Sequence, residues 1–211
     1  ILYRCWFFYR AFKPIVVLNY TIKPVIYGGL AASICRIPII SVVPGLGTAF
    51  IHENLITHVV KLLYRLSLNK SKHVIFENLD DLALFRQQKL VSVAISERIA
   101  GPGVDTDHFK RKPAKHNDPF IFLYIGRLLW DKGIGELVEA SRMLRDKGIL
   151  VRVQLLGPAA TNNKSSVGID KVKAWENEEI VEYLGETDDV RPFIEHADCI
   201  VLPSYREGLP G

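Results

Sequence analysis

Short apolar runs rich in β-branched residues alternate along this chain with longer segments of helical periodicity, and this alternation restricts the folds available to it. Residues 37–43 are such a run, typical of a strand covered on both faces of a sheet. In residues 53–68, apolar side chains recur at the spacing of one helix face. Parallel strands need long crossovers, which are usually helical. The pattern therefore predicts a doubly wound α/β architecture.

The same pattern gives each expected element a range. We expect strands at residues 15–18, 37–43, 74–76, 95–100, 120–125, 151–156, 180–184 and 199–202. We expect helices at residues 2–12, 24–35, 53–68, 78–89, 133–147 and 188–195. The segment Asn78-Leu79-Asp80-Asp81 would supply side-chain acceptors for the start of the fourth helix, and Asp188 would cap the last. Small residues within 24–35 predict that this helix packs closely on the sheet.

A linker divides the chain in two. Residues 110–119 are polar, charged and interrupted twice by proline, which is typical of a connection between domains. We therefore expect one domain in residues 1–112 and another in 113–211. A pair of complete Rossmann-like domains needs roughly 300 residues or more. The 211 residues, which do not begin with Met, thus predict a piece containing parts of both domains.

The two halves differ in charge. The net charge of +4 is the sum of +8 over residues 1–112 (15 basic, 7 acidic) and −4 over residues 113–211 (12 basic, 16 acidic). A basic half is compatible with an anionic membrane surface or a nucleic acid, or is simply a solvated surface. No recognisable nucleic-acid module accompanies these cations, so we expect no nucleic-acid partner.

Cysteine usage and hydropathy indicate the compartment. Cys5, Cys35 and Cys199 are far apart and belong to no Cys/His cluster, so neither a zinc site nor a disulfide framework is predicted. Charged residues interrupt the apolar N-terminal segment, and no signal-peptide pattern is present. We therefore expect a reducing compartment and a cytoplasmic location.

The aromatic N-terminal segment has two interpretations. Trp6, Phe7 and Phe8 either face the core of an ordinary helix or hold the domain on an anionic membrane. Basic residues that would assist the membrane contact are Lys61, Arg65, Lys70 and Lys72. We prefer the core-facing interpretation.

Candidate functional residues follow the expected strands, because ligands bind at the carboxyl ends of open parallel sheets. Gly126, Arg127, Lys132 and Gly133 follow strand 120–125 and lead into a helix. A guanidinium and an ammonium beside a helix N-terminus suit a diphosphate. The alternative is that both cations lie in an ordinary surface loop.

Three other strand ends are less specific. Glu207 follows strand 199–202 in a loop of Gly and Pro residues, where it either binds sugar hydroxyls or caps backbone amides. The glycine-rich segment 45–48 lacks the third glycine of the dinucleotide fingerprint. The segment 101–105 is either a binding loop or the crossover between domains.

Four segments together resemble the retaining glycosyltransferases of family 4. They are Tyr124-Ile-Gly-Arg-Leu-Leu-Trp-Asp-Lys-Gly133, Leu155-Leu-Gly-Pro158, Tyr183-Leu-Gly-Glu-Thr-Asp-Asp-Val-Arg-Pro192 and Ala197-Asp-Cys-Ile-Val-Leu-Pro-Ser-Tyr-Arg-Glu-Gly-Leu-Pro210. The segments Asn19-Tyr-Thr-Ile-Lys-Pro24, Tyr27-Gly-Gly-Leu-Ala-Ala32, Gly45-Leu-Gly-Thr48 and Glu77-Asn-Leu-Asp-Asp81 resemble the subgroup that extends polyprenyl-diphosphate-linked glycans and exopolysaccharides. The resemblance implies the GT-B fold of two Rossmann-like domains, both incomplete here.

The resemblance also implies roles for particular residues. Arg127 and Lys132 match the pair that holds the donor diphosphate and stabilises the charge on the leaving group. Glu207 matches the first glutamate of a two-glutamate motif and would contact the donor sugar; the second would fall at position 215. Gly126, Gly208 and Leu209 complete the donor side, and Lys23, Gly45 and Gly47 are acceptor-side candidates. His52 cannot be aligned with the histidine that many members carry, and no protein nucleophile is assigned.

The implied activity is retaining, metal-independent transfer of a hexose or N-acetylhexosamine from a UDP-sugar to a lipid-linked or polysaccharide acceptor. The UDP-sugar is a substrate, and no cofactor is expected. Two alternatives remain open at this point: a nucleotide-sugar-binding fragment that is inactive when isolated, and a GT-B UDP-sugar epimerase.

Overall fold

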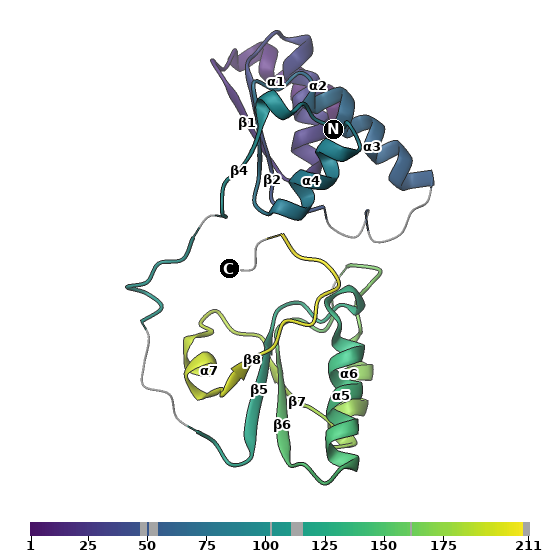
Figure 1. Cartoon of the computed structure of the whole chain (residues 1–211), viewed down its shortest axis with the longest axis vertical. Helices are drawn as coiled ribbons and strands as arrows, with labels where there is room; N and C mark the ends of the chain where they lie inside the picture. The colour runs from purple at the N-terminus through teal and green to yellow at the C-terminus, as the bar shows by residue number, and fades with distance from the viewer. Residues whose placement is uncertain (47–49, 51–54, 102, 111–115, 161, 209–211) are drawn as a thin grey trace. The chain divides into compact units, whose positions relative to one another are not determined.

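The computed structural model describes residues 1–46, 50, 55–101, 103–110, 116–160 and 162–208. The chain divides into two compact units (Figure 1). Unit 1 comprises Ile1–Val104 with Glu207–Gly211, and unit 2 comprises Asp105–Arg206. The predicted domain boundary between residues 112 and 113 lies outside the described residues.

Unit 1 contains a parallel four-stranded sheet. Its strands are β1 (Val17–Tyr20), β2 (Ile39–Val43), β3 (His73–Phe76) and β4 (Ser96–Arg98), in the order β1-β2-β3-β4. The register pairs Tyr20 with Val42, Val43 with Phe76, and Phe76 with Arg98. The carboxyl ends of all four strands therefore meet along one edge of the sheet.

The helices of unit 1 connect these strands. They are α1 (Leu2–Phe12), α2 (Gly29–Ile34), α3 (Leu55–Leu68) and α4 (Leu79–Gln87), and a π-helical turn, Pro24–Gly28, precedes α2. An ideal Cβ on Gly28 would lie 2.5 Å from Asn19 Oδ1, and one on Gly29 would lie 2.1 Å from Ser67 Oγ. Side chains of β1 and α3 thus occupy the space that larger residues would need, which confirms the predicted close packing.

Unit 2 contains a second parallel sheet, in the order β7-β6-β5-β8. Its strands are β5 (Phe120–Ile125), β6 (Val151–Leu156), β7 (Glu182–Gly185) and β8 (Cys199–Ile200). Its helices are α5 (Ile134–Asp146), α6 (Ile169–Asn177) and α7 (Arg191–His196). Figure 1 shows α5 and α6 on the same side of the sheet. The core between them and the sheet includes Val138, Leu155 and Trp175.

The structure confirms the alternation and corrects several details. β1 begins at Val17 rather than at residue 15, and Ile15 is 91% exposed. The segment 78–81 supplies a side-chain acceptor at the start of α4 as predicted: Asn78 is the N-cap, and its Oδ1 accepts a hydrogen bond from Asp81 N at 2.7 Å. Asp188 does not cap α7, whose N-cap is Val190 without a side-chain bond. The expected strands 95–100, 180–184 and 199–202 become β4, β7 and the shorter β8.

Two further corrections concern helices. The sequence interpretation missed α6, whose buried face consists of only Val172 and Trp175. The core-facing interpretation of Trp6, Phe7 and Phe8 is wrong for Phe7 and Phe8, whose side chains are exposed, whereas Trp6 is half-buried. None of the described helices combines the length and apolar content that crossing a bilayer requires.

Two leucines of unit 2 should differ in how much they contribute to the free energy of unfolding. Leu155 is fully buried on β6, whereas Leu150 is 80% exposed in the turn before it. Leu155→Ala should lower the free energy of unfolding by about 2–5 kcal/mol through lost burial and a residual cavity. Leu150→Ala should change it by less than about 0.5 kcal/mol. Urea unfolding of a Trp6→Phe background, followed by Trp130 and Trp175 fluorescence, measures both; equal losses would contradict this core.

Candidate functional site

Two glycines at the carboxyl edge of the unit 2 sheet place backbone segments in direct contact. Gly126, after β5, donates a backbone hydrogen bond to the Leu156 carbonyl at 2.9 Å. Gly157 follows β6 with φ +132°, and an ideal Cβ there would lie 2.2 Å from the Gly126 carbonyl oxygen. Gly126 itself has φ +148°. A side chain at Gly157 would push apart the two loops that leave the sheet, whereas one at Gly126 would meet the side chain of Tyr124.

The loop after β5 combines an anchored backbone with an exposed cation. The Arg127 carbonyl accepts a hydrogen bond from the Tyr124 hydroxyl at 3.0 Å. Leu128 is fully buried, and its N–H donates to the Pro158 carbonyl at 2.9 Å. The Arg127 side chain, between these fixed points, is exposed. Its guanidinium can therefore reach a ligand while its backbone stays in place.

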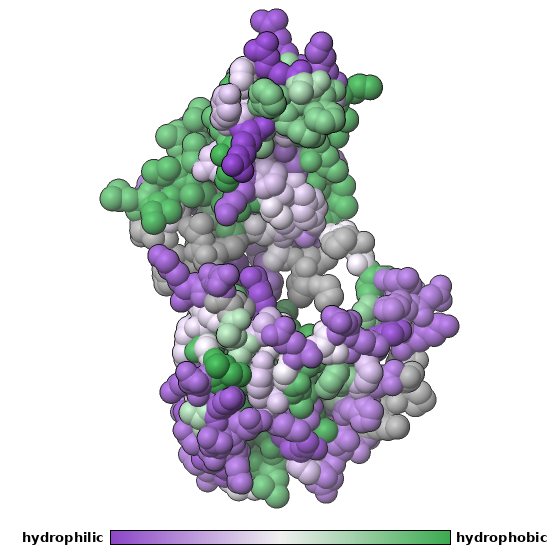
Figure 2. Space-filling view, turned by 180° about the vertical axis from the view of Figure 1, so that it is seen from behind, coloured by the Kyte–Doolittle hydropathy of each residue, from purple (hydrophilic) through white to green (hydrophobic). Residues whose placement is uncertain are grey.

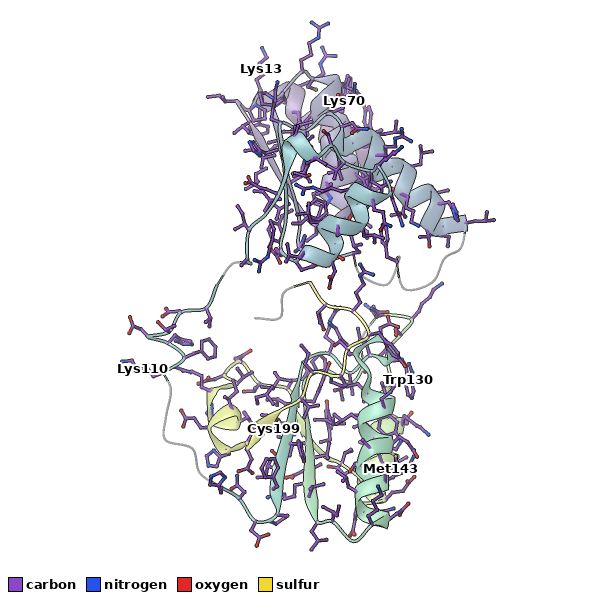
Figure 3. The ribbon with its side chains drawn as sticks, in the orientation of Figure 1. Lys13, Lys70, Lys110, Trp130, Met143 and Cys199 are labelled. Atoms are coloured by element: carbon purple, nitrogen blue, oxygen red, sulfur yellow. The ribbon has the colours of Figure 1, made fainter. Side chains whose placement is uncertain are left out.

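The loop then enters α5 through a glycine. Residues Trp130–Lys132 form a 3-10 turn, and Gly133 adopts the left-handed conformation with φ 70° and ψ 26° (Figure 3 labels Trp130). No side chain caps α5 at Gly133. The first backbone N–H groups of an α-helix have no intrahelical partner and mark the positive end of its dipole. Arg127 and the half-buried Lys132 thus belong to one connection that ends at an uncapped helix N-terminus.

The segment after β8 packs on this helix start. The Pro203 carbonyl oxygen lies 2.2 Å from where a Cβ on Gly133 would stand. Tyr205 N donates to the Asp131 carbonyl at 3.2 Å, and its hydroxyl donates to the Glu136 carboxylate on α5. That carboxylate raises the pKa of Tyr205. The strand ends of β5 and β8 are therefore joined at the start of α5.

Ser165 is a supporting residue that the sequence interpretation missed. Its carbonyl accepts a hydrogen bond from Trp130 N at 2.8 Å, and its hydroxyl accepts one from Asp131 N at 3.3 Å. The Leu128 carbonyl accepts from Val167 N at 3.0 Å in the same segment. In the sequence, the one indication that this segment lies near the β5–α5 loop is that it follows the strand end at Gly157.

The remaining donor-side candidates are placed differently. Glu207 and Gly208 are half-buried and group with unit 1, not with the unit that carries Arg127 and Lys132. Leu209 lies outside the described residues. Within the part of the chain that the structure describes, no group of three His, Cys, Asp or Glu side chains is arranged to hold a metal ion.

Two of the three acceptor-side candidates, Lys23 and Gly45, lie at the carboxyl edge of the unit 1 sheet. Lys23 is exposed just before the π-helical turn, Gly45 follows β2, and Gly47 lies outside the described residues. The structure adds a pair that sequence reasoning did not select: the Tyr20 hydroxyl donates to the Glu77 carboxylate across the ends of β1 and β3. This bond raises the pKa of Tyr20. Glu77 is buried, so Tyr20 covers a carboxylate at this edge.

Comparison with protein families identifies the chain. The model of "Glycosyl transferases group 1" matches residues 105–210. The chain belongs to the group 1 glycosyltransferases. The match covers the β5–α5 loop and the segment after β8, the two parts joined at the start of α5.

Curated relatives of this group 1 glycosyltransferase chain act in glycan synthesis, by their names. One is the N,N'-diacetylbacillosaminyl-diphospho-undecaprenol alpha-1,3-N-acetylgalactosaminyltransferase of Campylobacter jejuni, 31% identical over 87% of this chain and 51% of the relative. Another is the putative colanic acid biosynthesis glycosyltransferase WcaL of Escherichia coli, 27% identical over 63% of this chain and 34% of the relative. The chain thus spans about half the length of the first relative, and less of the second.

Solved structures agree on the fold. The chain matches Anabaena Alr3699/HepE in complex with UDP with a TM-score of 0.70 at 18% identity, over 96% of this chain and 56% of HepE. It matches TarM with a TM-score of 0.72 at 17% identity, over 98% of this chain and 40% of TarM. The expected GT-B class, present in part, is confirmed by these matches and by the two parallel sheets.

Alanine substitutions of Gly133, before α5, and Gly148, after it, form a matched pair that tests the contact with Pro203. Gly133 and Gly148 have nearly the same left-handed backbone, with φ 70° and 71°, but only Gly133 faces a nearby carbonyl. Gly148→Ala should cost about 1–2 kcal/mol from backbone strain alone. Gly133→Ala should cost more, because its Cβ also displaces the Pro203 segment. Thermal unfolding measures both, and equal losses would mean that the Pro203 contact contributes nothing.

Proposed function

We propose that the protein containing this chain transfers a hexose or N-acetylhexosamine from a UDP-sugar to a lipid-linked or polysaccharide acceptor, with retention and without a metal ion. The observation that carries the proposal is the β5–α5 connection, where Arg127 and Lys132 precede an uncapped helix N-terminus. Residues 113–211 would supply the donor side, and residues 1–112 the acceptor side.

The diphosphate of the donor would bind at this connection. The guanidinium of Arg127 can hold two phosphate oxygens in a fork, and the ammonium of Lys132 adds a second positive charge. The free N–H groups at the start of α5 complete the anion site. The structure of HepE, which shares the fold, is a complex with UDP. It supports a nucleoside diphosphate as the ligand class.

Charge stabilisation is the main catalytic contribution that these residues can make. When the bond between the anomeric carbon and the UDP oxygen breaks, negative charge develops on the departing phosphate. Arg127 and Lys132 stabilise that charge more in the transition state than in the ground state, which lowers the barrier. Two fixed cations make this possible without a metal ion.

The sugar would transfer by same-face attack. The acceptor hydroxyl oxygen forms the new bond to the anomeric carbon on the face from which UDP leaves, and its proton passes to the departing phosphate. Configuration is then retained, and no protein nucleophile is required. Glu207, Gly208 and Leu209 would contact the donor sugar.

The acceptor side and the location follow from the same proposal. The name of the Campylobacter jejuni relative specifies an acceptor on undecaprenyl diphosphate, which supports a lipid-linked acceptor here. Lys23, Gly45 and Gly47, with the Tyr20–Glu77 pair beside them, are the residues of unit 1 that we assign to it. Such an acceptor would place the protein in the cytoplasm at the inner face of the plasma membrane, without a nucleic-acid partner.

Substitution of Arg127 tests the diphosphate role. In the full-length protein, Arg127→Ala should lower kcat/KM for transfer from labelled UDP-sugar by about 10- to 100-fold, the loss of one charged contact of about 1.5–3 kcal/mol. Arg145→Ala is the matched control, since Arg145 is exposed at the other end of α5 and bonds the Glu178 carbonyl. It should transfer normally.

Unchanged activity of Arg127→Ala would contradict the role of the β5–α5 connection. Turnover of UDP-GlcNAc by the full-length protein without any acceptor would instead indicate an epimerase and overturn the transferase assignment.

A further inference from the structure

We propose that Ser165 is a positioning residue of the candidate donor site, because it caps the short turn that carries Lys132. Ser165 lies in the β6–α6 loop, whose described residues are 157–160 and 162–168. This role rests on the proposed function, since Ser165 would act on the transfer reaction through Lys132. One part of its test needs neither donor nor acceptor, so the two can fail separately.

The turn before α5 begins with backbone N–H groups that it does not satisfy itself. Its N-cap, Leu129, makes no side-chain bond to it. Within the turn, Lys132 N donates to the Leu129 carbonyl at 3.0 Å, and Gly133 N donates to the Trp130 carbonyl at 2.9 Å. These bonds do not involve Trp130 N or Asp131 N. The first N–H groups of a helix need acceptors from outside it, and so short a helix is marginal on its own.

Ser165 supplies an acceptor for both groups. Its carbonyl oxygen accepts a hydrogen bond from Trp130 N at 2.8 Å, and its hydroxyl oxygen accepts one from Asp131 N at 3.3 Å. Serine is a preferred N-cap residue because its hydroxyl accepts this kind of bond. An N-cap normally precedes its helix directly, whereas Ser165 performs the same role from another loop. The start of the turn therefore depends on a residue that is distant in sequence.

Bonds on both sides of Ser165 hold the β6–α6 loop in place. Ser165 N donates to Asn163 Oδ1 at 2.9 Å, and Val167 N donates to the Leu128 carbonyl at 3.0 Å. Val167 is buried in the core of unit 2. The tip of the loop, residues 162–164, is exposed, and Figure 2 shows hydrophilic side chains over much of the visible face of unit 2. Ser165 thus lies between a polar tip and a buried base that is bonded to the β5–α5 loop.

The residue before Lys132 is held from two sides. Asp131 N donates to the Ser165 hydroxyl, and the Asp131 carbonyl accepts a bond from Tyr205 N at 3.2 Å. Lys132 follows directly and is half-buried, which limits the directions that its ammonium group can take. A small displacement of a catalytic group can cost much of its effect. A change at Ser165 therefore acts on the charge that Lys132 presents to the diphosphate.

Arg127 does not depend on this cap. Its carbonyl accepts a hydrogen bond from the Tyr124 hydroxyl at 3.0 Å, and the next residue, Leu128, is fully buried. Loss of the cap should therefore reduce the contribution of Lys132 and leave that of Arg127 intact. A general loss of stability would affect both cations, so this difference identifies a positioning role.

Transfer kinetics of the full-length protein test this role. Ser165→Ala should lower kcat about 5-fold, equivalent to about 1 kcal/mol. The KM for the UDP-sugar should change little, because the charge on the leaving phosphate is greatest in the transition state. Ser165→Thr keeps the hydroxyl and should transfer normally. Ser165→Ala should add little loss to Lys132→Ala, but its full loss to Arg127→Ala.

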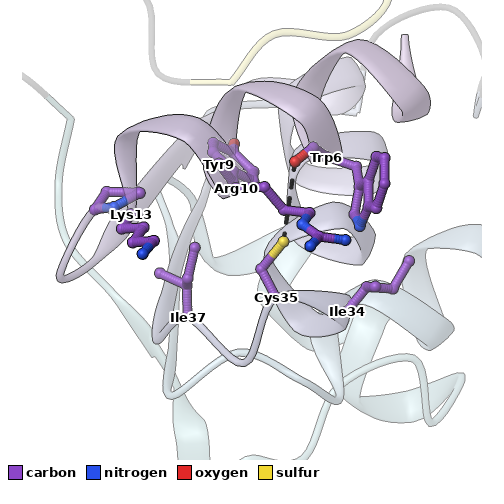
Figure 4. A pocket seen from close by; sticks show the side chains of 8 residues that line it. Trp6, Tyr9, Arg10, Lys13, Ile34, Cys35 and Ile37 are labelled. Atoms are coloured by element: carbon purple, nitrogen blue, oxygen red, sulfur yellow. Dashed lines mark hydrogen bonds between the residues drawn. The ribbon is translucent and has the colours of Figure 1, made fainter.

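Ser166→Ala is the matched control. The Ser166 hydroxyl donates to the Ala159 carbonyl at 2.8 Å, within the same loop. This variant loses one hydrogen bond, as Ser165→Ala does, but keeps the cap, so it should transfer normally. A second control lies in unit 1, where Arg10 and Trp6 line a pocket of about 660 Å³ (Figure 4). Arg10 packs over the Trp6 ring, and Arg10→Ala should leave the KM for the UDP-sugar unchanged.

Hydrogen exchange of the full-length protein tests the cap without substrates. The amide of Asp131 should exchange faster in Ser165→Ala, because its acceptor is removed. It should exchange at the original rate in Ser166→Ala and in Ser165→Thr. The thermal midpoints of Ser165→Ala and Ser166→Ala should be similar, since each variant loses one partly buried hydrogen bond.

Normal transfer by Ser165→Ala, together with a loss in Lys132→Ala, would overturn the role of Ser165 and leave the proposed function in place. Equal losses in Ser165→Ala and Ser166→Ala, unchanged exchange at Asp131, or a full additional loss in the Lys132→Ala background would also overturn it. Normal transfer by Lys132→Ala would contradict the diphosphate site itself, and the proposed function would then fail together with the role of Ser165.

Discussion

The direct contact between backbone segments at the carboxyl edge of the unit 2 sheet is the constraint on which the candidate donor site depends. A Cβ on Gly157 would strike the Gly126 carbonyl, and one on Gly133 would strike the Pro203 carbonyl, each at 2.2 Å. Without side chains at these points, the ends of β5, β6 and β8 converge on the start of α5. The connection that carries Arg127 and Lys132 reaches the start of α5 through that convergence, and the proposed diphosphate site depends on it.

The two units differ in charge, and in the proposed reaction each binds a different substrate. Unit 2 carries net negative charge in sequence, yet the loop proposed for the donor is locally cationic. Unit 1 is basic, and its exposed aromatic helix adds apolar surface to that charge. Local arrangement rather than net charge thus decides what each surface can bind, which is why the overall value of +4 carries little information about function.

Sequence patterns predicted the elements in which one physical effect dominates, either the burial of an apolar strand or the capping of a helix start by polar side chains. A buried β-branched run located β2, an apolar run located β5, and the polar side chains of the segment 78–81 located the start of α4. Helix α6 was missed because only Val172 and Trp175 on it are buried among charged residues, too few for a clear period. The exposure of Phe7 and Phe8 was also missed, since aromatic content alone does not reveal which face of a helix meets the core.

The candidate site was predictable to a similar extent. Strand ends and glycines indicated Arg127 and Lys132, whereas Ser165 and the Tyr20–Glu77 pair arise from contacts between distant segments. The central claim is that a nucleoside diphosphate binds at the start of α5. An amide NMR titration of this chain with UDP tests it most directly: resonances of Arg127 and of Ile134–Glu136 should shift, while those of Gly148 and Ile149, beyond the other end of α5, should not. Shifts confined to Gly148 and Ile149, or to unit 1, would contradict the account.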